Sequence, residues 1–212
     1  MATAAQWQFE KEEMMTDFAK LQEFDFVVVV DKSGSMSKED CANGQSRWKY
    51  MQETAGAFCR SLGKLDGDGL NFVLFSGNSI EKFEGVTAAT VDNIFATCEP
   101  GGSTPLDSAL SCALELAGKS DKKDFILCFT DGEPDNKEAV ATVIRNAAER
   151  QATDDALTIL FVQVGADAGA TAYLQELDTL TGCKFDIVDA KTITEAEKFA
   201  SIGELILAAI EG

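Results

Sequence analysis

Carboxylate and hydroxyl side chains occur at three separate places in this sequence, each beside an apolar run or a turn. Asp31, Ser33 and Ser35 follow directly on a run of apolar residues, Thr104 lies in a loop that begins with two glycines, and Asp131 follows another apolar run. Oxygens of these two kinds are the hard ligands that Mg²⁺, Mn²⁺ and Ca²⁺ prefer. If the three loops meet, their five side chains form one side of a metal site.

The elements that must position these side chains alternate between short apolar runs and amphipathic segments. The apolar runs predict strands at residues 24–30, 70–75, 124–130, 157–164 and 185–188. Three-and-four spacing of apolar residues predicts helices at residues 48–62, 106–117 and 140–147, a shorter one around 174–177 and a terminal one over 196–210.

The strands are rich in Val and Ile, which is typical of strands buried on both faces of a parallel sheet with crossover helices. Residues 79–83 follow the second strand too closely for a crossover helix, so we expect an antiparallel edge strand there. The sequence therefore predicts an α/β fold: a doubly wound, mostly parallel sheet with one antiparallel edge strand and helices on both faces.

In such sheets a site lies outside the carboxyl ends of two neighbouring strands whose helices leave to opposite faces. Asp31 and Asp131 occupy strand ends of this kind. Thr104 precedes Pro105, which suits the first position of a helix, and Asp107 completes a capping-box-like pattern. Further along, we expect Glu133 and Asp135 to form a solvated rim.

Composition and charge narrow the classes of function. The chain has no histidine, which removes Ser-His-Asp and Cys-His nucleophiles and the usual zinc ligand. Its formal net charge of −18 repels phosphate backbones and anionic lipid, so neither nucleic acid nor a membrane is an expected partner. Six cysteines without a CxxC pair are predicted to be reduced and structural.

The 212 residues, 45% of them hydrophobic, are enough for one domain with a full core. We expect that domain at residues 21–212, preceded by a helical extension at residues 1–20 with an apolar stripe. The N-terminus has no signal-peptide pattern and no stretch is long enough to cross a membrane, so the expected location is the cytoplasm.

In their order and context the five oxygen-bearing residues resemble the metal-ion-dependent adhesion site of the von Willebrand factor A (vWA) domain. That motif is written Asp-x-Ser-x-Ser, then Thr, then Asp, and the resemblance extends over about residues 21–212. It implies a Rossmann-like fold and a bound Mg²⁺, with Mn²⁺ or Ca²⁺ as alternatives. The implied direct ligands are the three hydroxyls of Ser33, Ser35 and Thr104, with Asp31 and Asp131 ligating directly or through water.

The resemblance also implies a mode of action, in which a Glu or Asp of a partner protein completes the metal coordination. The chain is similar to the intracellular bacterial and phage members of the family, some of which work with AAA+ ATPases of the MoxR type or in stress-response complexes. We therefore expect a non-enzymatic adaptor whose partner is a protein, with an AAA+ ATPase as one candidate.

Two other functions remain open from the residues. A Mg²⁺-dependent phosphotransferase or phosphatase of the haloacid dehalogenase type also has an Asp after its first strand, but it needs a second Asp where this chain has Ser33. A GxxxxGK[ST] phosphate loop does not occur. The other possibility is a metal-independent scaffold, in which the five residues only cap turns and helices.

Overall fold

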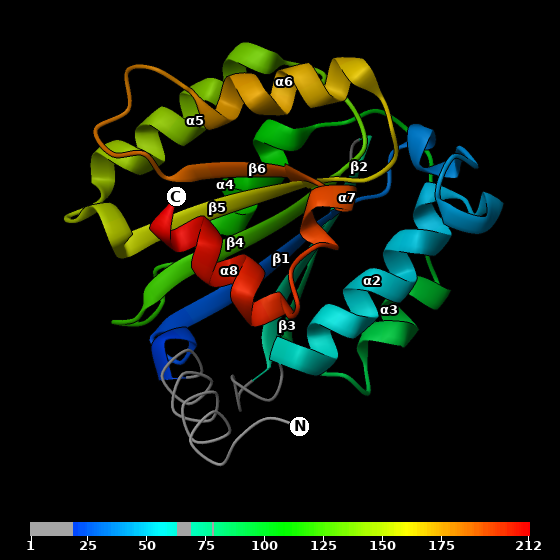
Figure 1. Cartoon of the computed structure of the whole chain (residues 1–212), viewed down its shortest axis with the longest axis horizontal. Coiled ribbons are helices and arrows are strands. Elements are labelled where there is room, and N and C mark those ends of the chain that lie inside the picture. Colours follow the sequence, from blue (N-terminus) through cyan, green and yellow to red (C-terminus); the bar gives the residue numbers. More distant parts are fainter. Residues whose placement is uncertain (1–18, 63–68, 78) are drawn as a thin grey trace, which may run out of the picture.

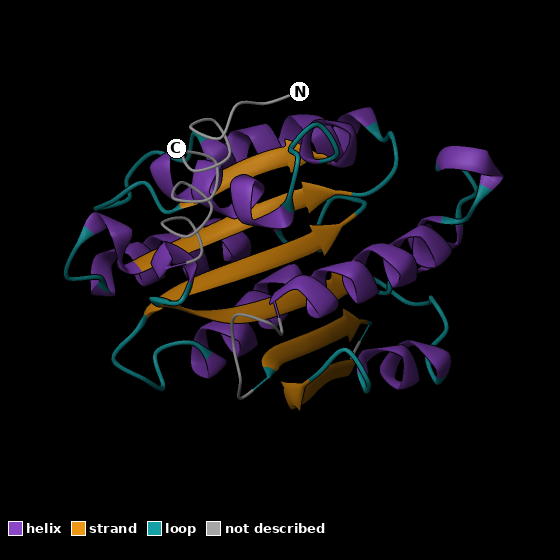
Figure 2. Ribbon diagram, turned by 60° about the horizontal axis from the view of Figure 1, so that its bottom comes forward, coloured by secondary structure: helices purple, strands orange, loops and turns teal. Residues whose placement is uncertain are grey.

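A six-stranded sheet forms the centre of the structure, a computed structural model that describes residues 19–62, 69–77 and 79–212. The strand order is β3-β2-β1-β4-β5-β6, and only the β2–β3 pair is antiparallel. Figure 2 shows the arrows of the parallel strands pointing in the same direction, so that their carboxyl ends lie on one side of the molecule. The strands are β1 (Phe24–Asp31), β2 (Leu70–Ser76), β3 (Ser79–Val86), β4 (Lys123–Thr130), β5 (Leu157–Gln163) and β6 (Val188–Thr192).

Helices cover both faces of this sheet. Figure 1 shows α8 crossing in front of the strands, and buried residues of α2 pack in the same layer of the core. The described helices are α2 (Arg47–Leu62), α3 (Val91–Ala96), α4 (Leu106–Leu116), α5 (Lys137–Arg150), α6 (Ala168–Asp178), α7 (Ile193–Ala196) and α8 (Ile202–Glu211). Three short 3₁₀ turns accompany them: η1 (Gly34–Ser37), η2 (Ala42–Gly44) and η3 (Asp154–Ala156).

The alternation of side chains along β1 explains why the core has two layers. Val28 and Val30 pack on one face with buried residues of α2, α3 and α8. Val27 and Val29 pack on the other face with buried residues of α4, α5 and α6. Because successive side chains of a strand point to opposite faces, a continuous apolar run fills both layers.

This layering places a topological switch point between β1 and β4. The helix that follows β1, α2, lies on one face, whereas α5, which follows β4, lies on the other. The carboxyl ends of these two neighbouring strands therefore lie at the switch point, which is where ligands bind in sheets of this kind. The predicted doubly wound fold, with its antiparallel edge strand, is confirmed.

Two predicted elements differ from the structure. The strand predicted at residues 185–188 begins only at Val188 and continues to Thr192. Because β6 lies at the edge of the sheet, only one of its faces needs apolar residues. Its sequence, Val-Asp-Ala-Lys-Thr, therefore does not show the pattern of a strand buried on both faces. The single terminal helix predicted over residues 196–210 is two helices, because α7 ends at Ala196 and Ser201 caps a new helix through the Glu204 amide.

Other expectations concern the ends and the cysteines. Most of the predicted helical extension at residues 1–20 lies outside the described residues. The six cysteines are free, and three of them, Cys59, Cys112 and Cys128, are buried. Within the described part of the chain, no helix has the length and apolar character that a membrane span requires.

Candidate functional site

Asp31 is the last residue of β1, and its side chain is fully buried at the switch point. Its Oδ1 accepts the Ser33 amide at 2.7 Å, and its Oδ2 accepts the hydroxyl of Thr130 at 2.8 Å. Burial, and then repulsion from the nearby Asp131, raise the pKa of Asp31 to about 6, and the hydrogen bonds from Ser33 and Thr130 oppose that shift. The two neighbouring strands thus hold a carboxylate whose charged form is disfavoured by burial and would be stabilised by a nearby cation.

A row of oxygens extends from this carboxylate along η1. The hydroxyls of Ser33 and Ser35 are 3.1 Å apart, and the Ser35 hydroxyl donates to Oδ1 of Asp131 at 2.7 Å. Ser33 and Asp131 are buried, whereas Ser35 is partly exposed. Side-chain contacts therefore connect two of the three predicted loops, although Ser35 and Asp131 are 96 residues apart in sequence.

The third loop is joined to the first by main-chain hydrogen bonds. The Gly34 amide donates to the Gly102 carbonyl at 3.0 Å, and the Gly101 amide donates to the Lys32 carbonyl at 2.8 Å. Gly102 has a φ of 82°, and a Cβ there would lie 3.1 Å from the Cα of Gly77. The glycine at position 102 therefore allows this loop to lie against the end of β2, whereas an added Cβ at Gly101 would meet no atom within 4 Å.

Thr104 is buried, and its loop is fixed in a different way from the prediction. Its amide donates to Oδ1 of Asp135 at 3.1 Å, and its carbonyl accepts the Asp135 amide at 3.0 Å. Helix α4 begins at Leu106, and Pro105 is its N-cap without a side-chain bond, so the predicted capping role was wrong. Glu133 and Asp135, expected as a solvated rim, are exposed, and Asp135 in addition ties the Thr104 loop to the loop that carries Asp131.

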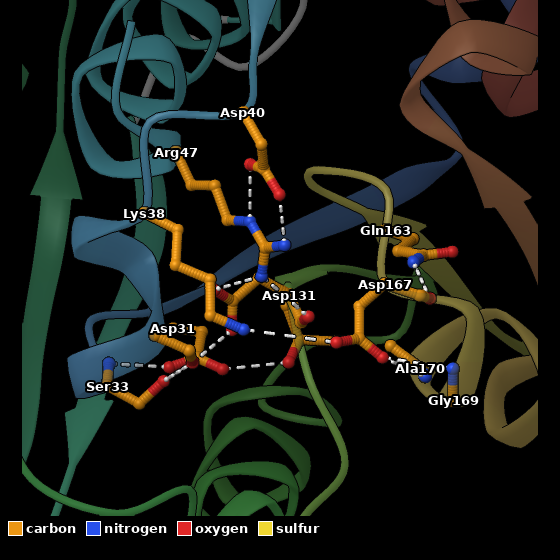
Figure 3. A network of polar contacts seen from close by, with 12 residues as sticks. Asp31, Ser33, Lys38, Asp40, Arg47, Asp131, Gln163, Asp167, Gly169 and Ala170 are labelled. Carbon is orange, nitrogen blue, oxygen red and sulfur yellow. Dashed lines mark hydrogen bonds and ion pairs between the residues drawn. The ribbon is translucent and has the colours of Figure 1, made fainter.

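Sequence reasoning missed Arg47, at the start of α2. Figure 3 shows its guanidinium between Asp40 and Asp131. It donates to the Asp40 carboxylate through Nε at 2.7 Å and Nη2 at 2.5 Å, and to Oδ2 of Asp131 through Nη1 at 2.9 Å. These bonds raise the pKa of Arg47 and lower that of Asp40. The one signal of its burial in the sequence was that Arg47 lies four residues before Met51 and therefore on the same, buried face of α2.

The spacing of the oxygens tests whether a divalent ion suits this site. Mg²⁺ binds oxygens at 2.0–2.1 Å in octahedral geometry, so neighbouring ligands are about 2.9 Å apart. The separations Ser33–Ser35 and Ser35–Asp131, 3.1 and 2.7 Å, lie on either side of this value, and they are also ordinary lengths for hydrogen bonds between such side chains. Among the described residues no group of three or more His, Cys, Asp or Glu side chains is placed to hold a metal. A metal at this site would therefore depend on hydroxyls together with two carboxylates.

The comparison with protein families gives one match. The family model of the von Willebrand factor type A domain matches residues 26–133 of the chain. This range includes all five predicted site residues and is just over half of the 212-residue chain. No curated protein matches the sequence.

Solved structures with the same fold have sequences that differ greatly from this one. Manganese-loaded TRAP protein of Plasmodium vivax has a TM-score of 0.58 at 16% identity, with 86% of this chain and 74% of that chain covered. The minor pilin PilB of Streptococcus sanguinis has a TM-score of 0.59 at 14% identity, covering 88% and 60%.

The pilus adhesin SpaC of Lactobacillus rhamnosus GG has a TM-score of 0.57 at 17% identity, covering 89% of this chain and 30% of that chain. The chain therefore spans less than a third of SpaC and 60% of PilB. At these identities the likeness concerns the fold.

Proposed function

We propose that this chain, which belongs to the von Willebrand factor type A domain family, binds a divalent cation and through it an acidic side chain of a partner protein. Domains of this family are protein-interaction and adhesion modules. The cation would be held by Asp31, Ser33, Ser35, Thr104 and Asp131.

One observation carries this proposal: the side-chain oxygens of Ser33, Ser35 and Asp131 gather, from two loops, beside the buried carboxylate of Asp31 at the switch point. Each of these side chains has lone pairs left for a metal, because a hydroxyl has two and a carboxylate about four. A scaffold without metal would need only the hydrogen bonds. It would not need two buried carboxylates, Asp31 and Asp131, which share the single positive charge of Arg47.

Magnesium is the cation that this ligand set favours. All five side chains provide hard oxygen ligands, and three of them are neutral hydroxyls. The manganese in the TRAP structure supports Mn²⁺ as a second candidate, because the two ions accept the same oxygen ligands.

The partner would provide a carboxylate. Three neutral hydroxyls donate little charge, so a bound ion stays electron-poor, and one octahedral position remains for an outside ligand. A Glu or Asp of another protein fills such a position well. An adaptor in the cytoplasm that engages an AAA+ ATPase is the cellular role we propose, and it follows from the family resemblance rather than from any contact in the structure.

Calorimetric titration of Mg²⁺, Mn²⁺ and Ca²⁺ into chelator-treated protein tests the metal. We expect saturable binding by the wild type and none by Asp31→Ala. Asp121→Ala, an exposed Asp in the loop before β4, is the matched control and should bind like the wild type. Equal binding by Asp31→Ala and the wild type would contradict the proposal.

A second measurement distinguishes the alternative functions. Partner capture from cell extract should occur with Mg²⁺, stop with EDTA and fail with Thr104→Ala. Hydrolysis of a phosphoester by the wild type with Mg²⁺, lost in Asp31→Ala, would instead indicate an enzyme. Capture that persists in EDTA would indicate a metal-independent scaffold.

A further inference from the structure

Arg47 places a permanent positive charge inside the candidate site. Its side chain is only 2% exposed, and its Nη1 donates both to Oδ2 of Asp131 at 2.9 Å and to the Asp131 carbonyl at 3.2 Å. A guanidinium keeps its charge at any working pH. A cation that binds beside Asp131 therefore meets a fixed like charge on the other side of that carboxylate.

The two oxygens of Asp131 have separate partners. Oδ1 accepts the Ser35 hydroxyl at 2.7 Å and faces the row of ligand oxygens, whereas Oδ2 accepts the guanidinium. This division fixes the rotation of the carboxylate and leaves one oxygen for a metal. The guanidinium itself is held on its far side by the bidentate pair with Asp40 and packs against Gly165.

A count of charges shows what this arrangement does. Asp31 and Asp131 contribute two negative charges and Arg47 one positive charge, which leaves one negative charge. A divalent cation would then leave the loaded centre with one surplus positive charge. Asp40 compensates this surplus only in part, because it lies beyond the guanidinium and its side chain is 37% exposed to solvent, which screens it. With Asp31 and Asp131 alone, a divalent cation would be neutralised in full.

We infer that Arg47 sets the charge of this centre, so that a divalent cation binds weakly alone and tightly only together with a carboxylate ligand. The inference rests on the metal function proposed above. Arg47 acts through Asp131 and is thus a positioning residue. By linkage, the carboxylate and the cation then strengthen each other's binding by the same factor.

Three variants separate charge from packing. Arg47→Met removes the charge and keeps most of the buried stem. Arg47→Lys keeps the charge and loses the fork of hydrogen bonds. Asp40→Asn leaves Arg47 in place but removes its outer counter-charge, so that more of its field acts on Asp131.

The experiment titrates Mg²⁺ and Mn²⁺ into each full-length protein by calorimetry, with sodium acetate or sodium chloride at equal ionic strength. For the wild type we expect acetate to raise the metal affinity about tenfold. Arg47→Met should bind metal about tenfold more tightly in chloride and should lose most of the acetate effect. Arg47→Lys should stay near the wild type, and Asp40→Asn should bind several-fold more weakly in chloride. Thermal unfolding in EDTA shows whether each variant is folded.

The results can overturn the inference separately from the proposed function. If Arg47→Met and Arg47→Lys are folded and both bind metal more weakly than the wild type, Arg47 is only a structural support and the inference fails. A wild-type affinity that acetate does not change has the same consequence. If the wild type binds no metal, or Asp31→Ala binds as well as the wild type, the proposed function fails and the inference fails with it. If Arg47→Met is unfolded, Asp40→Asn decides: weaker metal binding than the wild type in chloride supports the inference, and equal or tighter binding contradicts it.

Discussion

Thr130, the last residue of β4, donates its hydroxyl to Oδ2 of Asp31, the last residue of β1, at 2.8 Å. Both side chains are fully buried. The hydrogen bond joins the two strands at the switch point and supports the charged form of a carboxylate that burial disfavours.

Thr130→Val should therefore destabilise the metal-free protein at neutral pH. The change keeps the shape of the side chain but leaves a buried carboxylate oxygen without its donor, which costs about 1–3 kcal/mol in the free energy of unfolding. Urea denaturation measures this loss. Thr158→Val, at a buried threonine of β5 away from the site, is the control, and an equal loss in both variants would contradict the role of the hydrogen bond.

Asp31 should also give the metal-free protein an unusual pH dependence. Its pKa is about 6 in the folded state and near the ordinary value of 3.8 in the unfolded state, so between these values only the folded state binds the proton. Proton binding by Asp31 contributes at most roughly 3 kcal/mol to the free energy of unfolding. This contribution is fully present below pH 3.8 and is lost as the pH rises through 6. Denaturation in EDTA from pH 4 to 7 measures the trend. Asp31→Asn should remove this part of the slope, and an unchanged slope would contradict the assignment.

Gly165→Ala should disturb Arg47 from a distance in sequence. Gly165 has a φ of 81°, and a Cβ there would lie 2.2 Å from Nε of Arg47. Gly44→Ala is a matched control, because Gly44 has a φ of 70° but no atom within 4 Å of an added Cβ. We expect the control to lose about 1–2 kcal/mol from the backbone alone and Gly165→Ala to lose clearly more. Equal losses in urea denaturation would mean that Arg47 moves aside freely.

Ser35→Ala should weaken Mg²⁺ binding at least about tenfold, since it removes the hydroxyl that lies between Ser33 and Asp131. Ser37→Ala is the control on the same 3₁₀ turn, where the residue is exposed. Calorimetry compares the two. Similar affinities in both variants would exclude Ser35 from the ligand set.

The sequence predicts the sheet well because its strands are buried on both faces, as the continuous run from Val27 to Val30 shows. The same logic fails at β6, which lies at an edge and needs only one apolar face. It also fails for the terminal helix, because Ser201 starts a new helix inside a continuous apolar pattern.

In the candidate site, too, some features follow from the sequence and others do not. Strand ends place Asp31 and Asp131 together, so their proximity follows from the topology. The roles of Arg47 and Asp135 depend on partners 84 and 31 residues away, and helix periodicity carries no information about such contacts. Thr104 shows the reverse case, since a local capping pattern was present but the loop contact with Asp135 determined its conformation.

Peptide groups, rather than side chains, join the loop of Lys32 and Gly34 to the loop of Gly101 and Gly102. The contact between these two loops is therefore independent of the side chain at position 35. Selection, in nature or in the laboratory, can exchange Ser35 while these two loops keep their conformation. Replacement of Ser35 by Asp, for example, is a route to a centre with a different preferred metal on an unchanged backbone.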